Sequence, residues 1–165
     1  MDRFALPALI VILGVAGCGG SSGNGGDSGP KAAYLTKAEA ACTKANTDLA
    51  ALKKAPPASV AEVPPYVHKI VDVARGTVTQ LSALSLPPAD AAALKSKLLD
   101  PLGVQLQAGD AYAAKVDAAA KSKDQAGLLQ LVTHPPTQTR VDLAFLKSYG
   151  FKACVQAADT ANASR

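Results

Sequence analysis

Cysteine is the residue type through which this sequence offers its clearest chemistry. The chain holds three cysteines, Cys18, Cys42 and Cys154. Cys18 follows a short apolar run, residues 4–15, and precedes a tract rich in glycine and serine, residues 19–30. Its thiol is the only soft nucleophile in this part of the chain, so Cys18 is a candidate for covalent modification.

Residues 1–17 have the layout of a secretory signal peptide. A short polar start, in which Asp2 offsets Arg3, is followed by the twelve-residue apolar run. A helix that crosses a bilayer needs about 20 apolar residues. We therefore expect a cleaved signal and export rather than a permanent transmembrane helix.

The residues Val15, Ala16, Gly17 and Cys18 resemble the bacterial lipobox, in which an aliphatic residue and two small residues precede a cysteine. By that resemblance Cys18 receives a diacylglyceryl group and becomes the first residue of the mature chain. Two acyl chains anchor a protein stably to a membrane where one is marginal. Residues 18–33 then form a flexible tether, because a Gly/Ser tract buries too little apolar surface to order itself. The alternative is an ordinary signal peptide in which Cys18 is incidental.

The remaining cysteines, Cys42 and Cys154, form an even pair. An exported protein meets an oxidising compartment, where paired thiols are oxidised. We therefore expect one disulfide between them, and the alternative is two buried free thiols.

Histidine gives no basis for a metal or cofactor site. His68 and His134 are the only two histidines and lie far apart in the sequence. A transition-metal site needs several imidazoles or thiolates at fixed spacing. The sequence has no CxxCH motif for haem attachment, and its single methionine, a possible haem ligand, is removed with the signal peptide. We expect both histidines to be solvated or at the edge of the core, with no metal and no cofactor.

The carboxylates do not form a catalytic pair. Glu39 and Glu62 are the only glutamates, and both are expected at helix starts. The aspartates lie apart, beside lysines or at helix starts, and surface roles explain them: Asp72, Asp110, Asp117 and Asp142. No serine lies in a nucleophile elbow. We name no catalytic residue and expect that the protein is not an enzyme.

Composition favours one small helical domain. Alanine, lysine and leucine dominate, aromatic residues are only 4% of the chain, and tryptophan is absent. The formal net charge is +4, and it is unchanged when residues 1–17 are removed. Because the lysines are scattered rather than arranged in a stripe, nucleic-acid binding has no support.

The first helical stretch is the clearest. Apolar residues recur at alternating spacings of three and four, which predicts one narrow buried stripe. Its members are Leu35, Ala38, Cys42, Ala45, Leu49 and Leu52. Thr36 and Glu39 match a capping box, which predicts a helix start at that point. Pro56 and Pro57 end the helix.

A second stretch continues the same alternation up to Pro87. It begins either at Ser59, with Glu62 completing another capping box, or after Val63, with a proline in the first turn. Its predicted stripe contains Val63, Val67, Ile70, Ala74, Thr77, Leu81 and Leu84.

A third stretch runs from Ala89 to about Lys121 and contains Pro101. We expect a kink there rather than a restart, because proline removes a backbone donor and clashes with the preceding turn. Its predicted stripe contains Leu94, Leu98, Leu102, Leu106, Gly109, Ala113 and Val116.

The fourth stretch begins near Ser122 or Asp124. Pro135 and Pro136 interrupt it, and a second half is predicted from Thr137. Gly150 fits the left-handed position that closes this helix, and Phe151 follows where a capping contact is common.

These stretches predict an all-α domain over residues 34–154, an antiparallel up-down bundle of about four helices with a frayed tail at 155–165. An even number of antiparallel helices returns the chain to the end where it began. The bundle therefore brings Cys42 and Cys154 to one end, in agreement with the redox argument.

The chain resembles small secreted lipoproteins of the high-GC Gram-positive, or actinobacterial, type. The resemblance rests on the lipobox and tether, and on short motifs at 34–46, 86–89, 109–110 and 149–154. It implies a disulfide-closed helical domain and supplies no activity. The proline pair at 135–136 departs from the uninterrupted last helix of that group.

From placement and composition we expect a lipid-anchored, extracytoplasmic protein of the cell envelope. Its role is non-enzymatic binding of an envelope protein, a wall component or a small ligand, by residues that the sequence does not identify. The alternative is a small-ligand carrier with a pocket between helices, near the proline breaks at Pro101 and Pro135. The four tyrosines either line such a cleft or lie at core edges.

Overall fold

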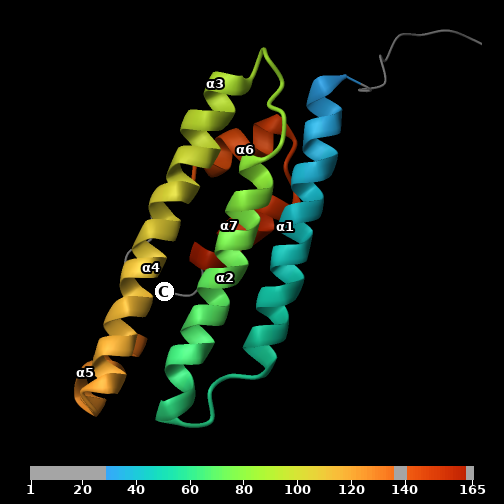
Figure 1. Ribbon diagram of the computed structural model, residues 1–165. Coiled ribbons are helices and arrows are strands. Elements are labelled where there is room, and N and C mark those ends of the chain that lie inside the picture. The colour runs from blue at the N-terminus through green and yellow to red at the C-terminus, as the bar shows by residue number, and fades with distance from the viewer. Residues whose placement is uncertain (1–28, 136–140, 163–165) are drawn as a thin grey trace, which may run out of the picture.

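The structure is a computed structural model that describes residues 29–135 and 141–162. In these ranges every regular element is helical, so the prediction of an all-α bundle is confirmed. Three long rods lie side by side and run in alternating directions (Figure 1). They are α1 (Pro30–Lys54), α2 (Val63–Ser82), and a composite of α3 (Ala91–Leu94), η2 (Lys95–Leu99) and α4 (Asp100–Lys121).

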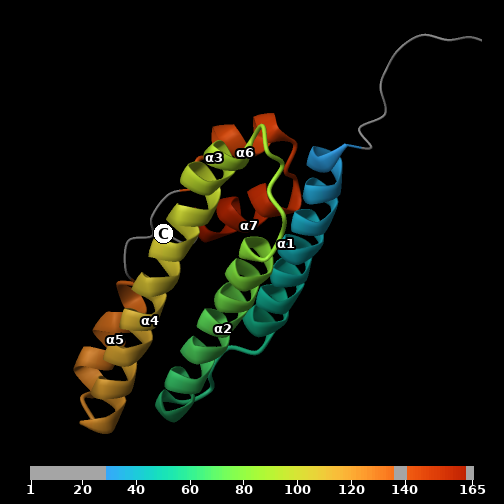
Figure 2. The same cartoon turned by 45° about the horizontal axis from the view of Figure 1, so that its top comes forward.

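Three short helices take the place of the predicted fourth rod. They are α5 (Gln125–Thr133), α6 (Leu143–Tyr149) and α7 (Ala153–Asn162). Figures 1 and 2 show α5 beside the lower end of α4, whereas α6 and α7 lie in the upper half. The predicted helical half starting at Thr137 falls partly outside the described residues, and helix resumes only at Leu143. The expectation of one fourth helix is corrected accordingly.

Helix α1 begins earlier than the sequence predicted. It starts at Pro30, because proline suits the first turn, where its missing N–H is not needed. The expected capping box at Thr36 is therefore wrong, and the Thr36 hydroxyl donates instead to the carbonyl of Ala32 at 2.9 Å. Residues 30–33 belong to the helix and not to a tether. The predicted stripe is confirmed, with Ala38, Cys42 and Ala45 buried at its centre.

Glu39 was expected at the start of the first helix, but its carboxylate lies at the start of α7. Its carboxylate accepts hydrogen bonds from the backbone N–H groups of Lys152 at 3.0 Å, Ala153 at 2.7 Å and Cys154 at 3.4 Å. The first N–H groups of a helix have no intrahelical partner, and a negative charge there also complements the helix dipole. Glu39 thus supplies from α1 the cap that α7 lacks in its own sequence.

The predicted disulfide between Cys42 and Cys154 is confirmed, with the two Cα atoms 5.0 Å apart. Cys42 lies midway along α1, however, and not near its end. The bond forms because the start of α7 meets the middle of α1, where Asn46 also donates to the carbonyl of Ala153 at 2.9 Å. Glu39, Cys42 and Asn46 lie on one face of α1 and together hold α7.

The expectation of a frayed tail at 155–165 is corrected for the residues that the structure describes, and 163–165 lie outside them. Helix α7 continues to Asn162, and Val155 is buried. The reason is local: a helix of 10 residues is marginal on its own, and the capped and disulfide-bonded start of α7 supplies its nucleus.

Helix α2 follows the second of the two predicted starts. It begins at Val63 with prolines in its first turn, after a short 3₁₀ segment, η1 (Val60–Glu62). The Glu62 carboxylate accepts from the backbone N–H of Ala58 at 2.7 Å, which stabilises this entry.

The third rod passes through Pro101 without a break. The five residues before Asp100 form a π-helical segment, Lys95–Leu99, and helix α4 continues directly from it. A wider π turn relieves the clash between a proline ring and the carbonyl four residues earlier. Of the two alternatives weighed for Pro101, the restart is wrong.

The start of α5 near Asp124 and the close of α6 at Gly150 were predicted, whereas the cap of α6 at Asp142 was not, because that helix was expected from Thr137. Asp124 caps α5 by accepting from Gly127 N–H at 2.8 Å, and Asp142 caps α6 by accepting from Phe145 N–H at 2.9 Å. The latter hydrogen bond lowers the pKa of the Asp142 carboxyl. Gly150 closes α6 with φ of 112°, and Phe151 N–H donates to the carbonyl of Leu146 at 3.0 Å.

Buried residues form two separate clusters. The upper core joins α1, the end of α2, α3, η2, α6 and α7. It contains Tyr34, Ala38, Ala41, Cys42, Leu81, Leu94, Leu98, Leu146, Tyr149, Phe151, Cys154 and Val155. The lower core joins α2, α4 and α5 and contains Val67, Val71, Ala113, Val116, Ala119 and Leu128.

Glu39→Ala will lower the free energy of unfolding by about 1–3 kcal/mol with the disulfide intact, because three backbone donors lose a charged acceptor. Denaturant unfolding measures the change. Glu62→Ala is the matched control, since Glu62 accepts one hydrogen bond in an exposed segment, and its cost will be below about 1 kcal/mol. Equal costs for the two variants would contradict the role of Glu39 as the cap of α7.

Candidate functional site

The residues that sequence reasoning selected for chemistry do not meet in one place. Cys18 lies outside the described residues, and Cys42 and Cys154 are joined in the disulfide. His68 and His134 are exposed, as predicted. His68 Nε2 lies 2.9 Å from the carboxylate of Asp117, while His134 contacts its neighbour in sequence. In residues 29–135 and 141–162 no group of three or more histidine, cysteine or acidic side chains could hold a metal ion.

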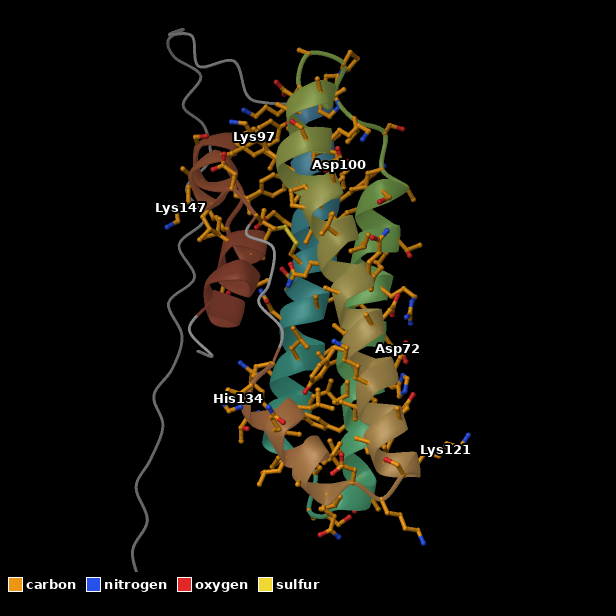
Figure 3. All side chains as sticks on the ribbon, turned by 90° about the vertical axis from the view of Figure 1, so that its left-hand side faces the viewer. Asp72, Lys97, Asp100, Lys121, His134 and Lys147 are labelled. Atoms are coloured by element: carbon orange, nitrogen blue, oxygen red, sulfur yellow. A yellow bond between two sulfur atoms is a disulfide. The ribbon has the colours of Figure 1, made fainter. Side chains whose placement is uncertain are left out.

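The aspartates have the surface roles that the sequence predicted, although their partners differ. Asp72 and Asp110 both pair with Arg75, and Asp117 pairs with His68. All of these side chains are exposed. The Arg75–Asp110 and His68–Asp117 pairs connect α2 to α4 along one flank of the bundle. These charged side chains do not lie on the other flank of the two helices. Figure 3 shows Asp72 on one side of the lower half and His134, at the end of α5, on the other.

A cavity of about 430 Å³ lies between α2 and α4, on the flank where α5 ends. It falls within the range of about 300–1,000 Å³ that is typical of small-molecule sites. Its walls come from α2, α4, the end of α5 and the loop after α1. The lining residues are Pro56, Pro57, Val63, Tyr66, Val67, Ile70, Val71, Ala74, Gln105, Leu106, Ala108, Gly109, Tyr112, Val132 and Pro135. We refer to this cavity as the α2–α4 pocket.

The α2–α4 pocket is an incompletely filled part of the lower core. Val67 and Val71 belong to both, whereas Ile70 and Ala74, which the sequence predicted to be buried, are exposed in the pocket wall. Opposite them α4 presents two small residues, Ala108 and Gly109, that leave the space open. A Cβ at Gly109 would lie only 3.6 Å from the Val71 side chain, so the two helices are close there.

Helix α5 ends beside the α2–α4 pocket and does not extend over it. Helix α5 stops at Thr133, and His134 has left the helical conformation, with φ of −128° and ψ of 69°. A residue that precedes proline is disfavoured in the helical region, and His134 precedes Pro135. The proline that the sequence marked as a helix break therefore borders the pocket. Pro101, the other predicted break, is not part of its wall.

The pocket wall carries no charged side chain. Its polar side chains are Tyr66, Gln105 and Tyr112. The Tyr112 hydroxyl donates to the carbonyl of Leu131 at 3.1 Å and ties α4 to α5, and partial burial raises the pKa of Tyr112. Such a wall suits an uncharged, largely apolar group and offers no acid–base pair.

The tyrosines thus divide between two roles. Tyr66 and Tyr112 line the pocket, whereas Tyr34 and Tyr149 lie in the upper core. Burial raises the pKa of Tyr34, and burial together with a hydrogen bond to Asp90 at 2.9 Å raises that of Tyr149. Sequence reasoning missed the pocket wall, although Ala74 and Gly109 at stripe positions were a signal that facing side chains would not fill the space.

Comparison of the chain with protein-family models, with curated protein sequences and with solved structures found no match. Among the helices that the structure describes, none is long and apolar enough to cross a lipid bilayer.

Tyr112→Phe will lower the free energy of unfolding by about 0.5–1.5 kcal/mol, because the variant loses the hydrogen bond that joins α4 to the end of α5. Thermal or denaturant unfolding measures this cost. The control is Tyr66→Phe in the same wall, whose hydroxyl makes no hydrogen bond to the described residues, and its effect will stay within about 0.5 kcal/mol. A loss of the same size in both variants would show that the Tyr112 hydroxyl does not secure α5.

Proposed function

We propose that the protein is a lipid-anchored, extracytoplasmic lipoprotein that acts as a non-enzymatic binding or interaction module of the cell envelope. The observation that carries the proposal is the Cys42–Cys154 disulfide. Structural disulfides form and persist in oxidising compartments, and they are rare in the reducing cytosol. The bond supports an address outside the cytosol, which the signal-like residues 1–17 also favour.

The disulfide also isolates Cys18 as the odd cysteine of the chain. An odd cysteine in an exported protein calls for another use of its thiol. Its lipobox-like context and the resemblance to actinobacterial lipoproteins support attachment of a diacylglyceryl group. A membrane anchor of this kind attaches ahead of Pro30, at the upper end of α1, whereas the α2–α4 pocket lies in the lower half.

A second candidate function is favoured by the pocket itself. A carrier of small ligands needs a concave, mostly apolar site with few polar groups, and the α2–α4 pocket has this composition and a suitable volume. In this alternative the envelope protein holds a small molecule rather than a macromolecular partner.

Cys18→Ala will abolish incorporation of a clickable palmitate analogue into the protein in intact cells, because the acceptor thiol is gone. In-gel fluorescence of the immunoprecipitated protein measures the label. The neighbouring variant Ser21→Ala keeps the thiol and will be labelled like the wild type. The proposal fails if the wild-type protein carries no label, or if Cys18→Ala is labelled as strongly as Ser21→Ala.

A further inference from the structure

The α2–α4 pocket is elongated along α2. Its wall includes residues from Val63 to Ala74 on this helix, a distance of about 16 Å at the helical rise of about 1.5 Å per residue. On α4 it extends from Gln105 to Tyr112. The loop residues Pro56 and Pro57 and the end of α5 also contribute walls, so the space is bounded by several segments and is not an open stripe on one helix face.

The volume of the pocket matches one hydrocarbon chain. A cavity of 430 Å³ equals the liquid volume of about 14 water molecules at roughly 30 Å³ each, and a methylene group is of similar size. A chain of about a dozen carbons therefore fills the space. One chain of this length accounts for the whole cavity volume.

The charge of the wall decides which part of a ligand enters. None of the wall residues is charged, and burying an ionised group without a partner is strongly unfavourable. An ionised headgroup therefore stays in solvent. Two apolar wall residues are themselves partly exposed, Ile70 at 37% and Val132 at 47%, and an inserted chain would cover apolar surface that now faces water.

We propose that the α2–α4 pocket binds the hydrocarbon tail of a single-chain amphiphile and leaves its headgroup in solvent. A fatty acid and a lysophospholipid share this chemistry. The inference rests on the second candidate function, because it names the ligand class that such a carrier would hold.

The test uses the full chain carrying Cys18→Ala, so that no covalently attached acyl chain competes, with the disulfide formed. The probe is N-undecyl dansylamide, which has an eleven-carbon chain with the dye at its head end, so the chain fits the pocket and the dye becomes more fluorescent at the apolar pocket mouth. Ala74→Phe places a ring in the pocket from α2 and will weaken probe affinity at least about tenfold. Ala108→Phe places a ring in the pocket from α4 and will weaken probe affinity to the same extent. A loss in both variants therefore does not come from a change in one helix alone.

Ala114→Phe is the matched control, because Ala114 is exposed on α4 and does not line the pocket. It will bind the probe within about twofold of the parent protein. Circular dichroism and the melting temperature establish that each variant is folded. Equal affinity in all three variants would place the probe elsewhere and overturn the inference.

Displacement of the probe tests the ligand class. Dodecanoate and lysophosphatidylcholine will both displace it if the tail is what binds, and displacement by only one of them tells a free fatty acid from a lysolipid. Displacement by a rigid sterol but by neither amphiphile would overturn the ligand class while leaving the carrier function standing. Absence of any binding would overturn both, whereas the palmitate labelling at Cys18 decides the anchor separately.

The alternative occupant of the α2–α4 pocket is a second copy of the chain. Sedimentation of the Cys18→Ala protein will show a monomer whose mass is unchanged by Ala74→Phe. A dimer that Ala74→Phe dissociates would show that the pocket is a self-association surface and would overturn the inference.

Discussion

The attachment of α7 to the middle of α1 is the constraint on which the upper half of the molecule depends. A covalent bond, a carboxylate that caps three backbone donors and an amide hydrogen bond all act within two turns of α1. They fix the start of α7 and, through Gly150, the aromatic residues just before it. Tyr149 stacks on Phe151 with ring centroids 5.4 Å apart, and Tyr34 meets Phe151 edge-on at 6.3 Å. The attachment acts together with the buried side chains of Leu146, Tyr149 and Phe151, which hold α6 and α7 over the upper core.

The lower half is built differently, and this difference accounts for the pocket. Its core comes from α2, α4 and the short α5, with exposed ion pairs along one flank and no covalent link. Surface ion pairs contribute little stability, so packing and the Tyr112–Leu131 hydrogen bond order this region. Small side chains at the helix contact and the early end of α5 leave part of that packing incomplete. Stability is thus concentrated at one end of the bundle and the candidate site lies at the other.

Much of this architecture follows from the periodicity of apolar residues and from the capping residues at helix ends. The stripes of the first and third helices, the helix start near Asp124 and the closing role of Gly150 rest on local rules that the tertiary structure did not override. The cap at Asp142 was not predicted, because the helix was expected from Thr137. The cysteine pair was predicted correctly from its even count and the oxidising compartment, but the argument that the bundle brings both cysteines to one end is wrong, because α1 begins at Pro30 and places Cys42 at its middle. Glu39 shows the limit of local rules: its spacing from Thr36 fits a capping box, yet it caps a helix more than a hundred residues later. The pocket depends on which stripe residues lack a facing partner, and one sequence does not encode that locally.

The π-helical turn before Pro101 also sets the orientation of the leucines around it. Leu94, Leu98, Leu102 and Leu106 are separated by steps of four, and each such step advances about 40° beyond a full α-helical turn. In a regular helix this drift would carry Leu106 well away from the face on which Leu94 lies. A turn with more residues cancels part of the drift, so one rod buries Leu94 and Leu98 in the upper core and still directs Ala113 and Val116 into the lower core. The widened turn is therefore a phase correction that lets a single helix serve both hydrophobic centres.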